Sequence, residues 1–198
     1  SYIGEDVTNN VRTIKNVPLR LRNADGFEQF LVGRTEIRGE IVMLKKDFSA
    51  LNEKRRKNGD PEFANPRNLA AGTIRQLDPK LVAARPLHFR GYDLLRDEAS
   101  DIPTNMFAYE ALSALGITRN HEASVFTTID DAMRFVEHIG EVRDKLAFNT
   151  DGLVIKVNDR AQFAKLGVVG KQPRAAVAYK YAAEQATTIV KDIVISIG

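Results

Sequence analysis

Apolar and polar residues alternate along residues 37–43 with the period of a β-strand. Within FEQFLVGRTEIRGEIVML, the odd-numbered positions from Ile37 to Met43 form one face, and Arg38, Glu40 and Val42 form the other. The pattern predicts a strand that holds Glu40 among apolar neighbours. A carboxylate in such a place is most often an exposed residue at the edge of a sheet, so a structural and a functional interpretation of Glu40 both remain open.

A second strand is predicted over RPLHFRGYDLL, residues 85–95, where Leu87, Phe89 and Tyr92 are available for packing. The same stretch carries His88, and a single histidine in a strand is more often a structural residue with a partner than a metal ligand. The other two histidines lie far away in the sequence, so no metal-binding triad is indicated. PLRLR, residues 18–22, is also expected to be a strand.

Lysines stand inside two further strand-like runs. DGLVIKV, residues 151–157, contains Lys156, and AVAYKY, residues 176–181, contains Lys180. Burying an ammonium group is costly unless an anion meets it, so the two lysines suggest a phosphate site. The alternative is that both side chains point to solvent, as alternate residues of a half-exposed strand do.

Helices are predicted where apolar residues recur at intervals of three and four behind capping residues. The expected N-caps are Asp47, Thr104, Thr128 or Asp130, and Asn158, and the expected terminating glycines include Gly116 and Gly167. These signals predict helices over residues 5–15, 45–58, 104–116, 127–148 and 158–167.

FANPRNLAAGTIRQLDP, residues 63–79, is the most unusual stretch of the chain. Asn65 followed by Pro66 is typical of a helix start. Arg67 and Arg75 stand eight residues apart, about two helical turns, which would align them on one helix face. Two aligned arginines over small residues form a good anion-binding surface; the alternative is a pair of surface salt bridges.

Two other basic features are candidates for contacts with a polyanion. The predicted helix over residues 45–58 ends in a basic cluster from Lys54 to Lys57. Such a cluster is most often a solvated helix face, but exposed Lys and Arg side chains are also what DNA phosphates contact. Arg143 lies eight residues before Asp151, and it is either an exposed residue at a helix end or turned toward the lysine-bearing strands.

Composition narrows the class of protein. The chain has 198 residues, of which 43% are hydrophobic and 28% charged, as is typical of one soluble globular domain. It has no cysteine, which excludes disulfides, thiolate catalysis and cysteine-based zinc sites. It also lacks signal peptides, membrane-length apolar runs and the common glycine-rich phosphate loops. We therefore expect a cytoplasmic protein with no membrane partner, whose net charge of +3 is compatible with a phosphate-rich ligand.

Five motifs, in this order, resemble the adenylation domain of bacterial NAD-dependent DNA ligases over nearly the whole chain. They are EIRGE (36–40), FANPRNLAAGTIRQLDP (63–79), RGYDLL (90–95), DGLVIKV (151–157) and AVAYKY (176–181). The arginine-bearing stretch and the DG-x-V-I-K strand are highly specific in combination. The resemblance implies an α+β nucleotidyltransferase fold of the DNA ligase and mRNA-capping type, with antiparallel sheets that hold the nucleotide between them and helices outside.

The resemblance also implies residue roles. Glu40 would contact the ribose of the adenosine, Tyr92 would stack on the adenine, and Val154 would line the base pocket. Lys156 and Lys180 would hold the α-phosphate, where fixed cations stabilise the charge that develops during attack on phosphorus. Positions linked in this family to phosphate, nucleotide or nicked-DNA handling are matched by Arg67, Arg75, Arg143 and Asp151.

One family motif is absent from the 198 residues, namely the K-x-D-G sequence whose lysine is the nucleophile. We therefore expect residues 1–198 to be a partial adenylation domain that lacks the upstream K-x-D-G segment and the downstream OB-fold. We also expect it not to adenylate itself, since a lysine must attack to form the phosphoramidate. The parent enzyme implied by the resemblance is a monomeric ligase that uses NAD and Mg²⁺ and acts on nicked duplex DNA together with its other domains.

Two other interpretations remain open. A noncatalytic nucleic-acid-binding module would use the basic helix and the paired arginines. An ATP-dependent ligase or RNA-capping relative would share the fold and a D-G…K strand, although the FANPRN…RQLD stretch argues against it.

Overall fold

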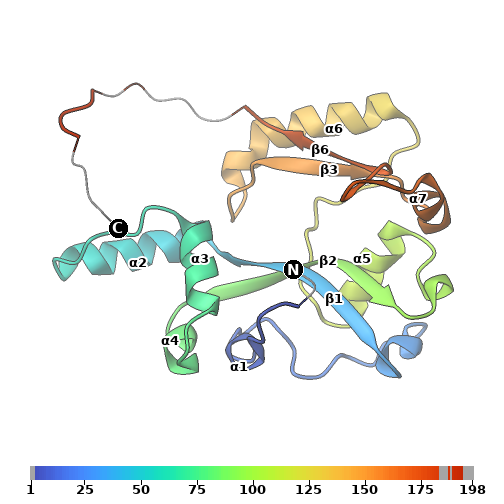
Figure 1. Ribbon diagram of the computed structural model, residues 1–198, viewed down its shortest axis with the longest axis horizontal. Helices are drawn as coiled ribbons and strands as arrows, with labels where there is room; N and C mark the ends of the chain where they lie inside the picture. Colours follow the sequence, from blue (N-terminus) through green and yellow to red (C-terminus); the bar gives the residue numbers. More distant parts are fainter. Residues whose placement is uncertain (1–2, 183–186, 188, 194–198) are drawn as a thin grey trace.

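Two antiparallel strand pairs carry the fold, and helices pack around them (Figure 1). The computed structural model describes residues 3–182, 187 and 189–193. In this part of the chain, β1 pairs with β2, β3 with β6, and β4 with β5. The expectation of an α+β chain with antiparallel sheets is confirmed. The strands are β1 (Thr35–Met43), β2 (Leu87–Arg96), β3 (Gly152–Lys156), β4 (Val168–Val169), β5 (Gln172–Pro173) and β6 (Ala176–Lys180). The helices are α1 (Thr8–Val11), α2 (Lys45–Lys57), α3 (Pro66–Ile74), α4 (Pro79–Ala83), α5 (Asn105–Ala114), α6 (Ile129–Val142) and α7 (Arg160–Leu166), with 3-10 turns η1 (Glu28–Leu31), η2 (Ala99–Asp101) and η3 (Arg143–Lys145).

The β1–β2 sheet has one apolar and one polar face, as the alternation in residues 37–43 predicts. Met43 and the β2 residue Leu94, which pairs with Ile37, are buried on the apolar face, whereas Arg38 and Glu40 are exposed on the other. Two clusters of buried side chains cover the apolar face, and they contain most of the buried apolar residues of the described chain. One cluster contains Phe30, Leu94, Ile102, Ala108, Ala111, Leu112, Leu115 and Ile117, and the other contains Ile14, Met43, Leu69, Ala70, Val82 and Leu87.

The pairing of β1 with β2 shifts by one residue in the middle of the sheet. Arg38 pairs with Asp93 and Gly39 pairs with Gly91, which leaves Tyr92 without a partner. A β-bulge of this kind re-aims a side chain. Tyr92 is 45% exposed although Gly91 beside it is buried. Leu87 and Phe89 pack in the core, as predicted from the strand pattern, but Tyr92 does not.

Several predicted helix boundaries are confirmed by capping hydrogen bonds. The side chains of Asn65, Thr104 and Thr128 accept backbone N–H groups at the starts of α3, α5 and α6. After α5 and α7, Gly116 and Gly167 adopt left-handed φ angles of 89° and 71°. They are the terminating glycines that the sequence predicts.

Two expected caps are wrong, and each has a tertiary reason. Asp47 lies in the first turn of α2 rather than at its cap, and its carboxylate lies 3.2 Å from the Nε2 atom of His88 on β2. This contact gives His88 the structural partner that was expected for it. Asp159, not Asn158, caps α7, because Asn158 instead accepts a backbone N–H in the first turn of α5 at 2.9 Å.

The segment before β1 is less regular than its sequence predicts. The helix expected over residues 5–15 is reduced to α1. The residues that follow form separate turns instead, such as the one in which the Ile14 N–H donates to the Val11 carbonyl at 3.0 Å. Residues 18–22 are not a strand, and Leu19 among them is 80% exposed. Residues 28–31 form the turn η1 instead of extended chain.

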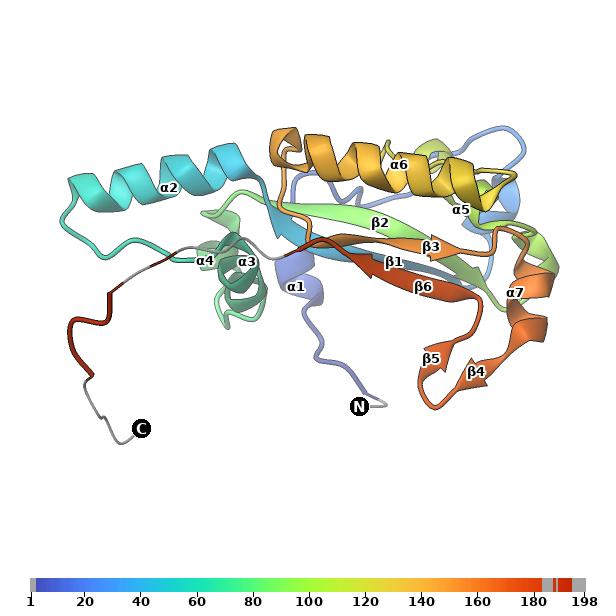
Figure 2. The same ribbon diagram turned by 90° about the horizontal axis from the view of Figure 1, so that it is seen from above.

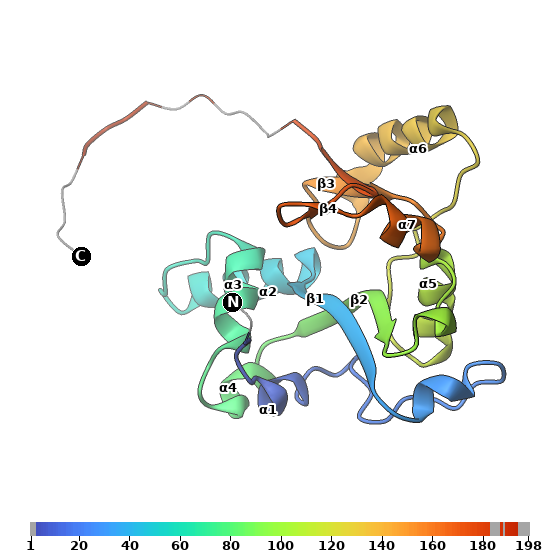
Figure 3. The same ribbon diagram turned by 45° about the vertical axis from the view of Figure 1, so that its right-hand side comes forward.

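The β3–β6 sheet lies between α6 and the β1–β2 sheet (Figures 1 and 3). The Tyr181 hydroxyl ties the end of β6 to α6 by donating to the Val136 carbonyl at 2.6 Å. Contacts at both ends join this half to the β1–β2 half. At one end the Lys45 N–H donates to the Ala147 carbonyl at 2.8 Å, and at the other Arg160 of α7 forms an ion pair with Asp93 of β2.

Candidate functional site

The antiparallel register places Val154, Lys156 and Lys180 on one face of the β3–β6 sheet. Lys180 pairs with Gly152 and Lys156 pairs with Ala176, and both paired residues and alternate residues share a face. The two lysines are therefore four residues apart along the sheet, about 13 Å at the rise of a strand. Val154 lies between them on the same face.

This lysine-bearing face looks toward the polar face of β1–β2. The charge of Asp93 on β2 affects the pKa of Lys156 on β3. Arg67 contacts Glu40 of β1, and its charge also lowers the pKa of Asp151 beside β3. The side chains that meet here are open to solvent rather than packed. Val154 is 60% exposed, Tyr92 45%, and the Glu40 side chain 57%. The arrangement leaves apolar, aromatic and charged groups accessible to one ligand.

Lys156 is half-buried, and burial lowers the pKa of its ammonium group because the charged form loses contact with water. The negative charge of Asp93 raises the pKa of Lys156, and the positive charge of Arg160 lowers it further. Asp93 is itself engaged by Arg160 and by the backbone N–H of Leu94. No described residue forms a hydrogen bond or an ion pair with the Lys156 ammonium group. A half-buried cation in this state is strongly stabilised by an anion.

Lys180 is exposed and has a partner. Its ammonium group donates to the Asp151 carboxylate at 2.7 Å, and this hydrogen bond holds the pKa of Asp151 below its ordinary value. The pair borders a pocket of about 640 Å³. The pocket is lined by Lys45, Arg143, Asp144, Asn149, Thr150, Asp151, Lys180, Tyr181 and Ala182. Lys45, Arg143 and Lys180 make it suited to an anion.

Arg143 is turned toward the lysine-bearing strands rather than out from the end of its helix. It follows α6 as the first residue of η3, its side chain is 21% exposed, and its guanidinium lies 5.3 Å from the centre of the Tyr181 ring. Tyr181 in turn follows β6. Of the two positions that the sequence leaves open for Arg143, the structure has the one next to Lys180.

The two arginines of the FANPRN stretch lie at opposite ends of α3. Arg67 is in the first turn of α3 and lies 3.7 Å from Glu40, but α3 ends at Ile74 and Arg75 is its C-cap. The Arg75 guanidinium donates back to the Ala71 carbonyl at 3.1 Å. The alternative of a surface salt bridge describes Arg67, and the anion-binding surface expected of the two arginines stays a prediction.

Three residues near the candidate site were not singled out from the sequence. Asp93 and Arg160 form an ion pair on the edge of the site beside Lys156, and the Arg160 Nε atom is buried without a hydrogen-bond partner in the described chain. Lys45 lines the pocket next to Lys180 and donates to the Asp144 carbonyl at 2.8 Å. No local pattern marks these residues, because the partner of each is more than 60 positions away in the sequence.

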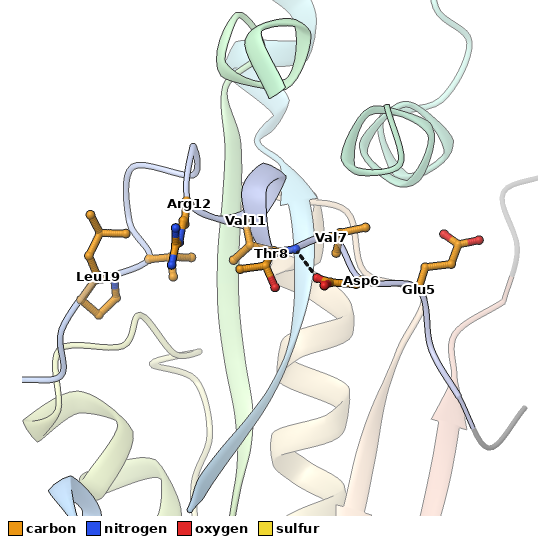
Figure 4. Close-up of a pocket in the computed structure, with 9 residues that line it drawn as sticks. Glu5, Asp6, Val7, Thr8, Val11, Arg12 and Leu19 are labelled. Atoms are coloured by element: carbon orange, nitrogen blue, oxygen red, sulfur yellow. Dashed lines mark hydrogen bonds between the residues drawn. The ribbon is translucent and has the colours of Figure 1, made fainter. Parts of the chain in front are cut away.

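A second pocket lies far from this site. It has a volume of about 400 Å³ and is built around α1 (Figure 4). The Asp6 carboxylate there accepts the Thr8 N–H at 2.9 Å. Hydrogen bonding by Thr8, from its side chain first and then from its backbone, lowers the pKa of Asp6. Because Ile14 after α1 belongs to the core, this pocket is on the opposite side of β1–β2 from the lysines. With Glu5 and Asp6 in its lining, it is poorly suited to a phosphate.

The described residues contain no group of three or more His, Cys, Asp or Glu side chains placed to hold a metal ion. No described helix is long and apolar enough to cross a membrane.

Comparison with known proteins identifies the family. A family described as NAD-dependent DNA ligase adenylation domain matches residues 1–184. A protein named DNA ligase from Koribacter versatilis is 45% identical over 196 residues, which are 99% of this chain and 29% of that protein. Proteins of the same name from Thermomicrobium roseum and from Neisseria meningitidis are 46% and 43% identical over 198 and 197 residues, which are 28% and 23% of their lengths. This chain thus spans less than a third of the curated relatives it matches. The chain belongs to the family of NAD-dependent DNA ligase adenylation domains.

Proposed function

We propose that this chain is the nucleotide-binding part of an NAD-dependent DNA ligase, a monomeric cytoplasmic enzyme that seals nicks in duplex DNA. The observation that carries the proposal is the half-buried Lys156, which has no hydrogen-bond or ion-pair partner in the described chain. It lies on the sheet face that looks toward β1–β2, where Tyr92 and Glu40 are exposed. A nucleotide offers the three matching parts: a phosphate, an aromatic base and a ribose.

The adenosine half of NAD fits the exposed groups in a definite order. Tyr92, freed from the core by the bulge, offers a flat ring for stacking on adenine, and Val154 on the facing sheet offers an apolar contact. The Glu40 carboxylate accepts hydrogen bonds from ribose hydroxyls. In this arrangement the base lies between the two sheets and the phosphates lie along the lysine-bearing face.

The lysines act on the α-phosphate. Attack on its phosphorus moves negative charge onto the nonbridging oxygens, and cations fixed beside them stabilise the transition state more than the ground state. Lys156 is held by the β3 backbone for this task, whereas Lys180 exchanges its Asp151 partner for the phosphate. Arg67, Arg75 and Arg143 would serve the remaining phosphates of the nucleotide or of the nicked DNA.

The covalent step needs a lysine nucleophile, and the K-x-D-G motif that carries it in this family is absent from the 198 residues. We therefore infer that this chain binds AMP and NAD without forming an enzyme–AMP adduct. Mg²⁺ in this proposal would be held mainly by phosphate oxygens and water, as is common for this ion, because the described residues form no metal cluster of their own.

Calorimetric titration of the purified chain with AMP and with NAD tests the proposal. Lys156→Ala should weaken AMP binding about tenfold to a hundredfold, as expected for a lost charge-assisted hydrogen bond. Lys57→Ala removes the same charge from an exposed residue already paired with Glu53 and should leave AMP binding unchanged. Equal affinities of Lys156→Ala and the unmodified chain for AMP would refute the site, and a covalent AMP adduct after incubation with NAD would refute the inferred inactivity.

A further inference from the structure

Residues 160–180 carry an unusual concentration of positive charge. They include five Lys or Arg residues and no Asp or Glu, a net charge of +5 in a chain whose total is +3. Two of the five have partners already described: Arg160 pairs with Asp93, and Lys180 with Asp151. The other three, Lys165, Lys171 and Arg174, are exposed and form no ion pair with a described residue.

These three residues are on a defined structure, which we call the basic arm, residues 165–174. It begins at the end of α7, passes through Gly167, and turns back as the β4–β5 hairpin with Gly170 at φ 62° and Lys171 in the turn. The Arg174 N–H donates to the Gly167 carbonyl at 3.0 Å and closes the base of the hairpin. Figure 2 shows the arm projecting from the body of the molecule beyond α7 and β6.

The arm differs from the other basic cluster, at the end of α2. There, Lys57 pairs with Glu53 at 2.7 Å and Arg56 pairs with Glu62 at 2.8 Å, while Arg55 lies over the Phe63 ring. Binding a polyanion through α2 would mean breaking contacts that already exist. The cations of the arm are free to exchange solvent counterions for phosphates, which is the main source of affinity for DNA.

We propose that the basic arm binds the phosphate backbone of the duplex that flanks the nick. This inference rests on the proposed function, since it takes nicked DNA as the substrate. Three cations spread over a projecting hairpin match a repeating anion better than a single phosphate group. Val168 and Val169 between them are 65% and 57% exposed, so no other described part of the chain covers this side of the arm.

Binding of a short nicked duplex, measured by fluorescence anisotropy as a function of salt, tests the role of the arm. The variant Lys165→Gln, Lys171→Gln, Arg174→Gln is compared with Lys54→Gln, Arg56→Gln, Lys57→Gln, which removes the same charge from α2. The arm variant should bind at least tenfold more weakly, and the slope of log affinity against log salt should fall by about 2.7, for three phosphates. The α2 variant should change much less.

AMP titration of the same samples separates this inference from the proposed function. AMP binding by the arm variant should equal that of the unmodified chain. Equal loss of DNA affinity in both triple variants, or no loss in the arm variant, would overturn the arm's role while leaving the nucleotide site intact. The arm's role would also be overturned if the unmodified chain bound AMP but no duplex at low salt. If the unmodified chain did not bind AMP, the nucleotide site itself would be refuted.

The absence of cysteine allows a direct measurement of position. Lys171→Cys and Lys57→Cys each create a unique thiol that can carry a photo-crosslinker. Position 171 should crosslink to the nicked duplex and position 57 should not. Crosslinking from both positions alike, or from 57 alone, would contradict the proposed contact; a docking surface for another protein segment would leave position 171 unreactive toward DNA.

Discussion

The two main sheets differ in what holds them. The β1–β2 sheet is covered on one face by both hydrophobic clusters, and its central residue Leu94 is fully buried. The β3–β6 sheet packs against α6 and leaves Val154 and Val177 60% and 63% exposed. Both sheets bear candidate ligand contacts. We infer that the β1–β2 sheet contributes most of the stability. Substitutions on the β3–β6 sheet should therefore alter ligand binding more than the free energy of unfolding.

The largest expected effect comes from a substitution in the core beside the β1–β2 sheet. Leu94→Ala should lower the free energy of unfolding by about 2–5 kcal/mol, because it removes a fully buried side chain and leaves a cavity. Val154→Ala on the other sheet should change it by less than about 0.5 kcal/mol, since the side chain is exposed. Urea unfolding followed by circular dichroism measures both. Similar losses in the two variants would show that the sheets contribute equally and that the contrast drawn here is wrong.

A matched pair of glycines sharpens the comparison. A Cβ at Gly39 would come within 2.2 Å of the Phe89 ring, and a Cβ at Gly152 within 2.2 Å of the Tyr179 carbonyl oxygen. Each alanine should cost about 1–3 kcal/mol of stability through overpacking. Gly152→Ala should in addition weaken AMP binding, because Gly152 is level with Lys180 and next to Asp151.

Unfolding and AMP titration of Gly39→Ala and Gly152→Ala are the measurements. Gly72→Ala is the control, since nothing lies within 4 Å of its added Cβ and alanine in a helix should stabilise by about 0.5–1 kcal/mol. If Gly152→Ala kept full AMP affinity despite its lower stability, the start of β3 would not help to position the phosphate site.

A smaller effect tests how the second sheet is attached. Tyr181→Phe removes the hydroxyl that donates to the Val136 carbonyl and should cost about 0.5–1.5 kcal/mol. Tyr179→Phe is its control, because the Tyr179 hydroxyl has no hydrogen bond to a described residue. The readout is the unfolding free energy, with hydrogen exchange of α6 amides as a local probe. Equal behaviour of the two variants would show that the hydroxyl does not secure α6.

The fold could be predicted from sequence where the signal is local. Alternation set the faces of β1, and the side chains of Asn65 and Thr104 capped the helices they precede. Prediction failed where a distant partner decides the outcome. Asp47 contacts His88, which lies 41 residues away on β2. The Asn158 side chain accepts the Met106 N–H of α5 instead of capping α7.

The candidate site was predicted mainly through family motifs, and its geometry required the structure. No spacing rule brings Asp93 beside Lys156 or Arg67 beside Glu40. The bulge at Tyr92 depends on which residues of β1 pair with β2, so the strand pattern alone assigned this ring to the core. The sequence also did not show that α3 ends one residue before Arg75, whose guanidinium donates back to the Ala71 carbonyl.

The smallest expected effect concerns the charge of Lys156. Because burial lowers its pKa in the folded chain, the unfolded chain binds more protons between that value and the ordinary one of about 10.4, and stability should rise with pH across this window. Lys156→Met, which keeps the volume without the charge, should abolish this part of the pH dependence in urea unfolding between neutral and alkaline pH. NMR titration of the lysine side chain should show that AMP raises the pKa, since phosphate favours the ammonium form, and that adenosine does not. A pKa raised equally by adenosine would mean that the base, rather than the phosphate, lies against Lys156, and the orientation of the nucleotide between the two sheets would have to be reversed.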